Sequence, residues 1–267
     1  MSKKVLVITG ASSGIGRATA VAAAESYNLV LAARNLEALR ETARLCRQKG
    51  AEAIEVQTDV SNEEDCQNLV EQTIDHFGKI DVLINNAGLS MRAIFEEVDL
   101  LVLKKLMDVN FWGTVYCTKY ALPYLLQSKG SVVGVSSIAG YKGLPARTGY
   151  SASKFAIHGF LETLRIENLK TGLHVLIACP GFTASNIRNT ALAADGSQQG
   201  ESPRDEGKMM SSQKVARHLL KAIHKRKRTI VLTTQGKLTV MLNKFFPGFV
   251  DKKVYDLMAQ EPDSPLK

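Results

Sequence analysis

Residues 4–16 read KVLVITGASSGIG and pass from a short apolar run directly into a cluster of glycines. The run KVLVIT predicts a buried strand, because a few consecutive apolar residues bounded by a turn signal are typical of one. The following ASSGIGRATAVAAAES, residues 11–26, has helical composition once past the glycines. The segment therefore predicts a strand, a glycine turn and a helix, the first unit of an α/β fold.

The spacing of these glycines suits a turn that binds a dinucleotide. Gly10 permits a tight exit from the strand, and Gly14 and Gly16 let backbone and helix approach a pyrophosphate closely. The helix N-terminus, with the hydroxyls of Ser12 and Ser13 beside it, presents unpaired N–H groups to an anion. The alternative interpretation is an ordinary glycine-rich turn, because a glycine pattern alone is a weak signal.

Strands and helices alternate along most of the chain. Further strands are predicted at 27–34, 51–59, 79–88, 131–137, 174–179 and 229–234, and helical stretches at 35–50, 61–78, 96–128, 149–170 and 213–228. This alternation predicts a single α/β domain over residues 1–267, with a doubly wound parallel sheet and helices on both faces. We expect Ser61 to cap the helix at 61–78. Ligands of such sheets bind at the carboxyl ends of the strands.

Composition and charge exclude several classes of protein. No apolar run is long enough for a membrane-spanning helix, so we expect no segment to cross a membrane. The four cysteines are scattered singly, which argues against a metal site or disulfides and favours the reducing cytoplasm. The net charge is +8, and residues 207–250 hold ten Lys or Arg and no Asp or Glu.

Ala33 and Arg34 end the second predicted strand, where NAD-binding proteins carry an acidic residue that grips the ribose 2′-hydroxyl. A carboxylate there would repel a 2′-phosphate, whereas a guanidinium pairs with it. The sequence therefore predicts NADP(H) as the preferred cofactor, with NAD(H) as the alternative if Arg34 is merely solvated.

A proton-transfer group is predicted within SSIAGYKGLPARTGYSASK, residues 136–154. If the chain is helical from Gly149 onward, Tyr150 and Lys154 are an i,i+4 pair on one face of the helix. A neighbouring ammonium group favours the phenolate and lowers the pKa of tyrosine from its usual value of about 10. Ser137 ends a predicted strand, so its hydroxyl is expected to hold a substrate oxygen near Tyr150. The alternative is a surface tyrosine and lysine on an amphipathic helix.

Polar residues also stand at other predicted strand ends. Asp59 ends the third strand, while Asn85, Asn86 and Gly88 end the fourth. Asparagine is common in turns for local reasons, so a structural role is the alternative there. Asn110 lies in the apolar context NFWGTVY and needs a hydrogen-bond partner if it is buried.

Six features occur in order along the chain: TGASSGIG at 9–16, NNAG at 85–88, Asn110, Ser137, YSASK at 150–154 and PG at 180–181. In this order and spacing they resemble the classical short-chain dehydrogenase/reductase family over roughly residues 4–185. The resemblance implies a Rossmann-type fold and hydride transfer between a nicotinamide cofactor and a carbonyl or alcohol.

The resemblance also implies roles for the residues that match the family motifs. Tyr150 would be the general acid/base, and Lys154 would lower its pKa and bind the nicotinamide ribose. Ser137 would position the substrate oxygen, and Asn110 would hold a water that links Lys154 to solvent. The implied cofactor-binding set is Gly10, Ser12, Ser13, Gly14, Ile15, Gly16, Arg34, Asp59, Val60, Asn86, Ala87, Gly88, Tyr150, Lys154, Pro180, Gly181, Thr183 and Ser185.

Two departures from the family pattern concern the cofactor. Ser13 stands where many members carry a basic residue that contacts NADP, so the choice of cofactor depends mainly on Arg34. After Pro180-Gly181, Thr183 and Ser185 replace a β-branched apolar residue and a threonine. The hydroxyl of Ser185 would then have to reach the nicotinamide amide.

Residues 184–212 are rich in Gly, Ser, Asp and Gln, too polar for a core, and predict a mobile loop over the site. We expect the pocket walls at 90–95, at 141–145 and in this substrate loop. The apolar side chains expected there indicate a fairly large apolar carbonyl compound: Met91, Leu144, Phe182 and Met209.

The basic C-terminal extension, residues 213–267, resembles that of the branch including 11β-hydroxysteroid dehydrogenases. Either it is an ordinary closing helix with a solvated face, or its apolar residues touch a membrane surface or cover a neighbouring subunit. No motif that reads nucleic acid accompanies the charge, so nucleic acid is not an expected partner. The apolar residues in question are Leu242, Phe245, Phe246 and Phe249.

These patterns predict a carbonyl reductase or alcohol dehydrogenase that uses NADP(H), in the cytoplasm or peripheral at a membrane surface. The family resemblance implies a homodimer or homotetramer. The alternative is a non-catalytic NADP(H)-binding scaffold or sensor that acts through its basic C-terminal region. The four expected catalytic residues are all present, which weighs against that alternative.

Overall fold

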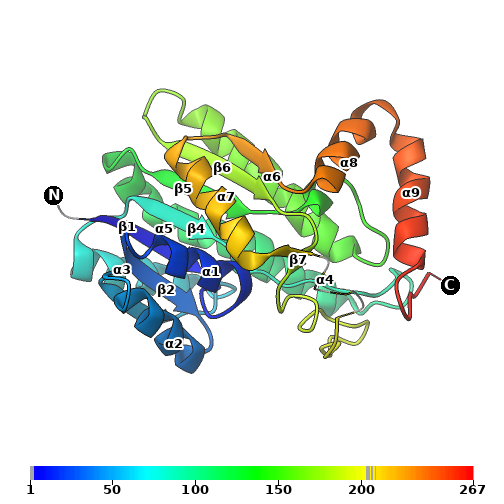
Figure 1. Ribbon diagram of the computed structural model, residues 1–267, viewed down its shortest axis with the longest axis horizontal. Coiled ribbons are helices and arrows are strands. Elements are labelled where there is room, and N and C mark those ends of the chain that lie inside the picture. Colours follow the sequence, from blue (N-terminus) through cyan, green and yellow to red (C-terminus); the bar gives the residue numbers. More distant parts are fainter. Residues whose placement is uncertain (1–2, 203–204, 206, 208, 267) are drawn as a thin grey trace.

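The computed structural model describes residues 3–202, 205, 207 and 209–266. In these residues a single large parallel sheet crosses the molecule, with helices on both faces, as the sequence predicts (Figure 1). Its seven strands lie in the order β3-β2-β1-β4-β5-β6-β9. They are β1 (Lys4–Thr9), β2 (Tyr27–Ala33), β3 (Ala53–Gln57), β4 (Val82–Asn85), β5 (Ser131–Val135), β6 (His174–Cys179) and β9 (Thr229–Val231).

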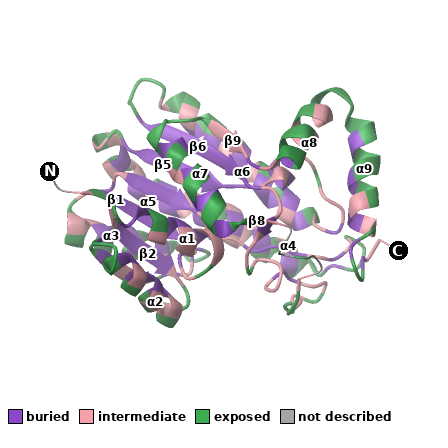
Figure 2. Cartoon of the chain, in the orientation of Figure 1, coloured by how far each residue is buried: buried purple, intermediate pink, exposed green. Residues whose placement is uncertain are grey.

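Successive side chains along the strands point to opposite faces of the sheet and pack into two separate hydrophobic cores. The covering helices are α1 (Gly14–Ala23), α2 (Leu36–Arg47), α3 (Glu63–Phe77), α5 (Gly113–Gln127), α6 (Thr148–Glu167) and α7 (Ser212–His224). On β1, Val5 and Val7 enter the core covered by α3, α5 and α6, whereas Leu6 and Ile8 enter the core covered by α1, α2 and α7. The sheet is therefore buried on both faces (Figure 2).

The strand order reverses between β1 and β4, which are neighbours in the sheet. At their carboxyl ends, Thr9 Oγ1 accepts hydrogen bonds from the backbone N–H groups of Asn86 and Ala87, each over 3.0 Å. The side-chain amide of Asn86 donates to the carbonyl oxygen of Thr9 over 2.9 Å. These bonds fix the glycine turn against the end of β4, at the place where doubly wound sheets bind their ligands.

The two helical stretches predicted within 96–128 form one continuous rod. Helix α4 (Leu100–Met107) passes through a π-helical turn, Asp108–Trp112, into α5, and the backbone angles stay helical at both junctions. Asn110 lies in this turn. A π turn accommodates one more residue than an α turn, and such turns are frequent at functional sites.

Several predicted element ends differ by a few residues from the observed ones, and two of these differences have a local cause. Asn62, not Ser61, caps α3, because its Oδ1 accepts two backbone N–H groups of the first turn at 2.8 and 3.2 Å. The last strand stops at Val231, short of the predicted 234. Thr233, at a φ of +68°, instead caps helix α8 (Thr234–Phe245).

The segment 184–212 contributes to a core, contrary to its prediction as too polar. Leu192 is buried beside Met91, with which it forms an isolated β-bridge. The short parallel strands β7 (Thr183–Ala184) and β8 (Met210–Ser211) pair the two ends of the segment. The segment is thus anchored at its ends and in its first half.

The C-terminal helices stand beyond the last strand of the sheet. Helix α8 and helix α9 (Pro247–Ala259) form a hairpin, orange and red in Figure 1. Leu242 packs against the small apolar cluster of α9, so it faces the hairpin itself. None of the helices in the described residues is long and apolar enough to span a membrane. Three aromatic side chains at the hairpin turn are exposed: Phe245, Phe246 and Phe249.

Candidate active site

A cavity of about 840 Å³ opens at the carboxyl ends of the central strands. Of the expected catalytic and cofactor-binding residues, Gly16 and Asn110 do not line it. All the others do: Gly10, Ser12, Ser13, Gly14, Ile15, Arg34, Asp59, Val60, Asn86, Ala87, Gly88, Ser137, Tyr150, Lys154, Pro180, Gly181, Thr183 and Ser185.

The glycine turn depends on its glycines for two different reasons. Gly10 and Gly14 have φ of +65° and +53°, a conformation that L side chains rarely adopt. A Cβ on Gly16 would lie 2.1 Å from the carbonyl oxygen of Gly10 and 2.6 Å from Nδ2 of Asn86. Gly16 therefore permits close packing behind the turn, while Gly10 and Gly14 shape its surface.

The N-terminus of α1 at this turn is suited to bind an anion. Ser13 is the N-cap, but its side chain makes no capping hydrogen bond, and the first turn contains no acidic residue. The first N–H groups of a helix have no partner within it, and the helix dipole makes this end positive. A phosphate group placed here would receive hydrogen bonds from these N–H groups.

Arg34 lies exposed at the carboxyl end of β2 and lines the same cavity. Its neighbour Asn35 is occupied as the cap of α2, where Oδ1 accepts the N–H of Ala38 over 2.9 Å. Arg17, the other basic residue near the glycines, lies outside the lining and pairs with Glu41 over 3.7 Å. A 2′-phosphate at this end of the cavity would therefore meet the guanidinium of Arg34.

Tyr150 lies in the first turn of α6, beside Ser137 at the end of β5. The Oγ of Ser137 accepts the N–H of Ala139 over 3.1 Å, which holds the hydroxyl at the cavity wall. Burial raises the pKa of Tyr150, while the hydrogen bond with Ser137 and then the positive charge of Arg147 lower it. Because burial dominates, the phenol is protonated at neutral pH and carries a proton to donate.

Lys154 lies one helical turn beyond Tyr150, with its Nζ 5.7 Å from the centroid of the tyrosine ring. The ammonium group is buried and donates a hydrogen bond to the carbonyl oxygen of Val135 over 3.0 Å. Burial lowers the pKa of Lys154 to about 8. Near neutral pH the group is still largely charged. The groups that lower the pKa of Tyr150 are Ser137, Arg147 and Arg188 rather than Lys154, so the predicted lowering by Lys154 is not found in this structure.

Asn110 is fully buried, and its side chain is used within the protein. Its Oδ1 accepts the N–H of Leu89 over 2.7 Å, and its Nδ2 donates to the carbonyl oxygen of Leu89 over 3.0 Å. Nδ2 also donates to Ser153 Oγ over 2.8 Å. Asn110 thus has the partners that the sequence required and ties the end of β4 to α6.

Two residues expected in the pocket wall lie elsewhere. Met91 is fully buried in a cluster with Leu106, and Met209 also falls outside the lining. Leu144 and Phe182 do line the cavity. A strand-end position could be recognised from sequence, but the direction in which each apolar side chain points could not.

The C-terminal hairpin supplies a wall of the cavity that sequence reasoning missed. Thr239 of α8 and Val254, Leu257 and Met258 of α9 line it. The sequence signal was present, because Val250, Val254, Leu257 and Met258 follow the i, i+4, i+7, i+8 spacing of one helical face. The spacing alone did not indicate that this face of the helix borders the cavity.

A buried polar cluster behind Ser137 was also missed. His158 Nε2 lies 2.9 Å from Ser136 Oγ and 3.6 Å from Cys179 Sγ. Burial lowers the pKa of His158 to about 4 and raises that of Cys179 to about 12, so both are neutral. All four cysteines are buried and free. In the part of the chain that the structure describes, no group of three or more His, Cys, Asp or Glu is placed to hold a metal ion.

The sequence model of the short chain dehydrogenase family matches residues 4–195. The chain belongs to this family, as its motifs indicate. It is 44% identical over 187 residues to 11-beta-hydroxysteroid dehydrogenase 1A of Arabidopsis thaliana and, equally, to 11-beta-hydroxysteroid dehydrogenase A of Sesamum indicum. Each match covers 69% of this chain and 53% of the relative, so the chain spans about half the length of these curated relatives.

Solved structures share the fold over most of the chain. A short chain dehydrogenase/reductase from Burkholderia phymatum in complex with NAD has a TM-score of 0.83 and 28% identity, covering 93% of this chain and 95% of its own. An alcohol dehydrogenase from the archaeon Thermococcus sibiricus, complexed with 5-hydroxy-NADP, has a TM-score of 0.76 and 27% identity, covering 86% and 96%. The protein therefore has the Rossmann fold of this family.

Proposed function

We propose that the protein is a single catalytic domain that uses NADP(H) to transfer a hydride between nicotinamide and a carbonyl or secondary alcohol. One observation carries the proposal: Tyr150, Lys154 and Ser137 meet in the cavity whose other end is the glycine turn and Arg34. A proton-transfer group and an anion-binding turn in one cavity are what hydride transfer from a dinucleotide requires.

The residues present fit a nicotinamide dinucleotide. The uncapped helix start at Ser13 would bind the pyrophosphate, and the absent side chains of Gly10 and Gly14 would let it approach. Arg34 would pair with the 2′-phosphate, which favours NADP(H) over NAD(H). The NAD and 5-hydroxy-NADP complexes of the two structural relatives support a nicotinamide cofactor in general.

The cofactor would supply the hydride, and the chain would manage the proton. In the reductive direction Tyr150 donates its phenolic proton to the carbonyl oxygen, while the hydroxyl of Ser137 holds that oxygen and stabilises the developing negative charge. Lys154 stabilises the phenolate that remains and binds the nicotinamide ribose. Asn110 holds Leu89 and α6 in place through its buried hydrogen bonds, which leave both of its N–H groups occupied.

The substrate is proposed to be a fairly large apolar ketone or secondary alcohol. Leu144, Phe182 and the α9 residues Val254, Leu257 and Met258 give the cavity an apolar lining. Helix α9 stands on the opposite side of the molecule from β2 and α2, which flank Arg34 (Figure 1). Steroids belong to this class, and the names of the plant relatives point the same way. The family resemblance supports a homodimer or homotetramer, and the free cysteines support a reducing compartment such as the cytoplasm.

A calorimetric titration of NADPH and NADH into the purified protein tests the cofactor. We expect tighter binding of NADPH, and a loss of about 10- to 100-fold in NADPH affinity in Arg34→Ala, because a charge-assisted pair with phosphate is lost. Binding of NADH should change little. Arg40→Ala is the matched control, since Arg40 is also exposed and lies outside the cavity.

The reaction is tested by screening ketones with NADPH against the wild type and Tyr150→Phe. We expect kcat to fall by about 10²- to 10⁴-fold in the variant while NADPH binds as before. Binding of neither cofactor would overturn the proposal. Tight NADPH binding without turnover of any ketone or alcohol would favour the scaffold or sensor alternative.

A further inference from the structure

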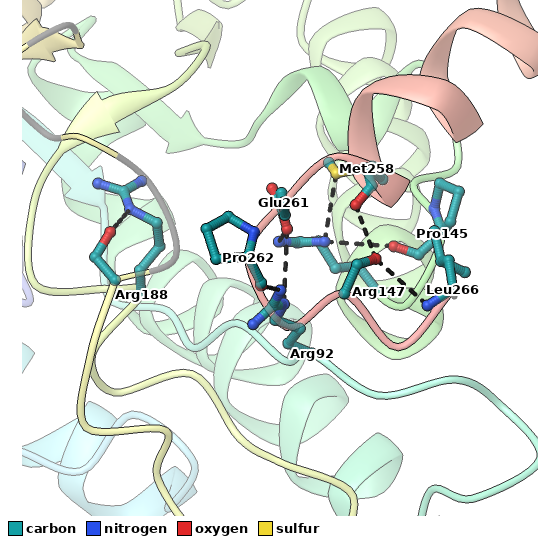
Figure 3. Close-up of polar contacts among 10 residues, drawn as sticks. Arg92, Pro145, Arg147, Arg188, Met258, Glu261, Pro262 and Leu266 are labelled. Atoms are coloured by element: carbon teal, nitrogen blue, oxygen red, sulfur yellow. Dashed lines mark hydrogen bonds and ion pairs between the residues drawn. The ribbon is translucent and has the colours of Figure 1, made fainter.

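The carboxylate of Glu261 is buried between two arginines. Its side chain is 3% exposed, and those of Arg147 and Arg92 are 11% and 10% exposed. Glu261 Oε2 lies 3.0 Å from an Nη of Arg147 and 3.6 Å from Nε of Arg92, and Figure 3 shows both guanidinium groups directed at it. Acidic residues are almost never buried unless they are paired, so this triad specifies one position for Glu261.

The two arginines come from neighbouring segments that border the candidate active site. Arg147 directly precedes α6, which carries Tyr150, and Arg92 follows the end of β4. An isolated β-bridge joins the two segments through the N–H of Ala93 and the carbonyl oxygen of Ala146, over 3.0 Å. The fold thus holds two positive charges together, and the carboxylate of Glu261 compensates their repulsion.

Glu261 is also attached to the last turn of α9. Its N–H donates to the carbonyl oxygen of Met258 over 3.3 Å, and Ser264 Oγ donates to the same oxygen over 2.9 Å. Met258 Sδ in turn lies 3.5 Å from an Nη of Arg147. Arg92 adds a hydrogen bond to the carbonyl oxygen of Pro262 (Figure 3). The triad therefore fixes the end of α9, and with it the side chain of Met258.

The rest of the hairpin is held to the protein less extensively. Lys142 and Asp251 form an ion pair over 2.5 Å, but the carboxylate side is largely exposed, and exposed pairs contribute little stability. Asn243 Nδ2 donates to the carbonyl oxygen of Tyr141 over 3.1 Å. The buried apolar residues of α9 form only a small cluster with Leu144 and Phe182. The buried triad is thus the most enclosed polar attachment described for the hairpin.

We propose that Glu261 is a positioning residue for substrate recognition. By binding Arg147 and Arg92 it seats α9 so that Val254, Leu257 and Met258 close the apolar end of the cavity over the substrate. This inference rests on the proposed function for its kinetic consequence, but the seating of α9 is a property of the folded chain alone. Gly10 and Arg34, at the cofactor end of the cavity, follow β1 and β2, and neither of these strands carries a member of the triad.

Glu261→Gln tests the proposal, because it keeps the shape of the side chain and removes the charge. The matched control is Asp263→Asn, the same loss of a carboxylate two residues away at an exposed position. In hydrogen–deuterium exchange we expect the amides of 250–258 to exchange about tenfold faster in Glu261→Gln, with the amides of β1 unchanged. The control should match the wild type in both regions.

The kinetic arm uses NADPH with 2-decalone, a bicyclic apolar ketone that would reach the α9 wall. We expect Glu261→Gln to raise KM about tenfold, with kcat within about threefold and calorimetric NADPH affinity within about twofold of wild type. A general structural defect would instead lower kcat and weaken NADPH binding together. If thermal melting shows that Glu261→Gln is unfolded, Glu261→Asp, which keeps the charge and shortens its reach, takes its place with the same expectations.

Unchanged exchange in 250–258 would overturn the proposal, as would faster exchange with an unchanged KM. A kcat loss that parallels weaker NADPH binding would also overturn it. If the wild type reduces no ketone, the proposed function fails instead. The exchange data then decide by themselves whether Glu261 seats α9.

Discussion

The ammonium nitrogen of Lys154 lies 3.0 Å from the carbonyl oxygen of Val135 and donates a hydrogen bond to it. This bond anchors the side chain at the end of β5, but it does not compensate for the loss of water around a buried charge. The remaining free-energy cost of burying the charge lowers the pKa of Lys154 from the usual 10.5 to about 8. It corresponds to about 3 kcal/mol against the charged form in the folded protein.

Lys154→Met should therefore stabilise the protein at pH 7 while abolishing its proposed activity. The substitution removes the buried charge but leaves the carbonyl of Val135 without its donor, so the net gain should raise the melting temperature by about 2–6 °C. We expect kcat to fall at least about 100-fold. A lower melting temperature would contradict this account.

The pH dependence of stability gives an independent check on the same residue. Between pH 8 and 10.5 the unfolded chain binds a proton that Lys154 has already released in the folded protein, so this group makes stability rise with pH in that window. Chemical denaturation at pH 7.5 and pH 10 measures the free energy of unfolding of the wild type and of Lys154→Met. The advantage of the variant over the wild type should be smaller at pH 10.

Asn110→Leu should destabilise the protein by about 2–4 kcal/mol, because the backbone groups of Leu89 and the hydroxyl of Ser153 lose their buried partner. It should also weaken NADPH binding, since Gly88 lies directly beside Asn110 at the cavity. Thr114→Val is the control: it removes one buried hydrogen bond, to the carbonyl of Asn110, without touching Leu89. Chemical denaturation measures the free energy of unfolding, and calorimetry measures the affinity for NADPH. If Thr114→Val lost as much stability and affinity as Asn110→Leu, the role of Asn110 in joining Leu89 to α6 would be contradicted.

Two glycine substitutions should have opposite effects. Gly16→Ala places a methyl group 2.1 Å from the carbonyl oxygen of Gly10, so we expect a loss of about 2–4 kcal/mol and at least tenfold weaker NADPH binding. Gly159→Ala adds a methyl group that meets nothing within 4 Å, on the exposed side of α6. It should stabilise the protein by about 0.5–1 kcal/mol through helix propensity, with NADPH affinity unchanged.

His158 should make the protein sensitive to acid. Burial, then the charges of Lys154 and Arg165, lower its pKa from 6.5 to about 4. Between these values the unfolded chain binds a proton that the folded protein excludes, so stability falls as the pH is lowered from 6.5 towards 4. His158→Gln retains a hydrogen-bonding group for Ser136 but cannot titrate. As the pH falls from 7 to 5, the free energy of unfolding of His158→Gln should therefore increase relative to that of the wild type, as measured by urea denaturation. A difference that stays constant with pH would contradict a lowered pKa of His158.

The fold was predictable because its determinants are local in sequence. The apolar run of β1, the glycines at 10–16 and the alternation that follows each specify a unit through neighbouring residues, and parallel pairing then follows from the helical crossovers. The residues at strand ends were predictable for the same reason, since a parallel sheet brings all its carboxyl ends to one edge.

Contacts between distant segments were not predictable. Arg147 and Glu261 are 114 residues apart, and nothing in either segment indicates that they meet. The family motifs likewise pointed to Gly16 and Asn110 without showing how they act. Both residues lie behind the cavity lining. Gly16 leaves space for the carbonyl group of Gly10, and Asn110 forms hydrogen bonds with the backbone of Leu89, in the segment after β4.

The π-helical turn at Asp108–Trp112 makes the length of the α4–α5 rod as important as its composition. One additional residue rotates everything beyond it by about 100° around the helix axis. Leu106 before the turn and Cys117 after it are buried in two different cores, so both faces are fixed from outside the helix. Deleting a single residue here would restore an ordinary α-helix and yet turn either Leu106 or Cys117 towards water. A substitution on the outer face of the rod leaves both buried faces in place, whereas a change of length by one residue moves one of them out of its core.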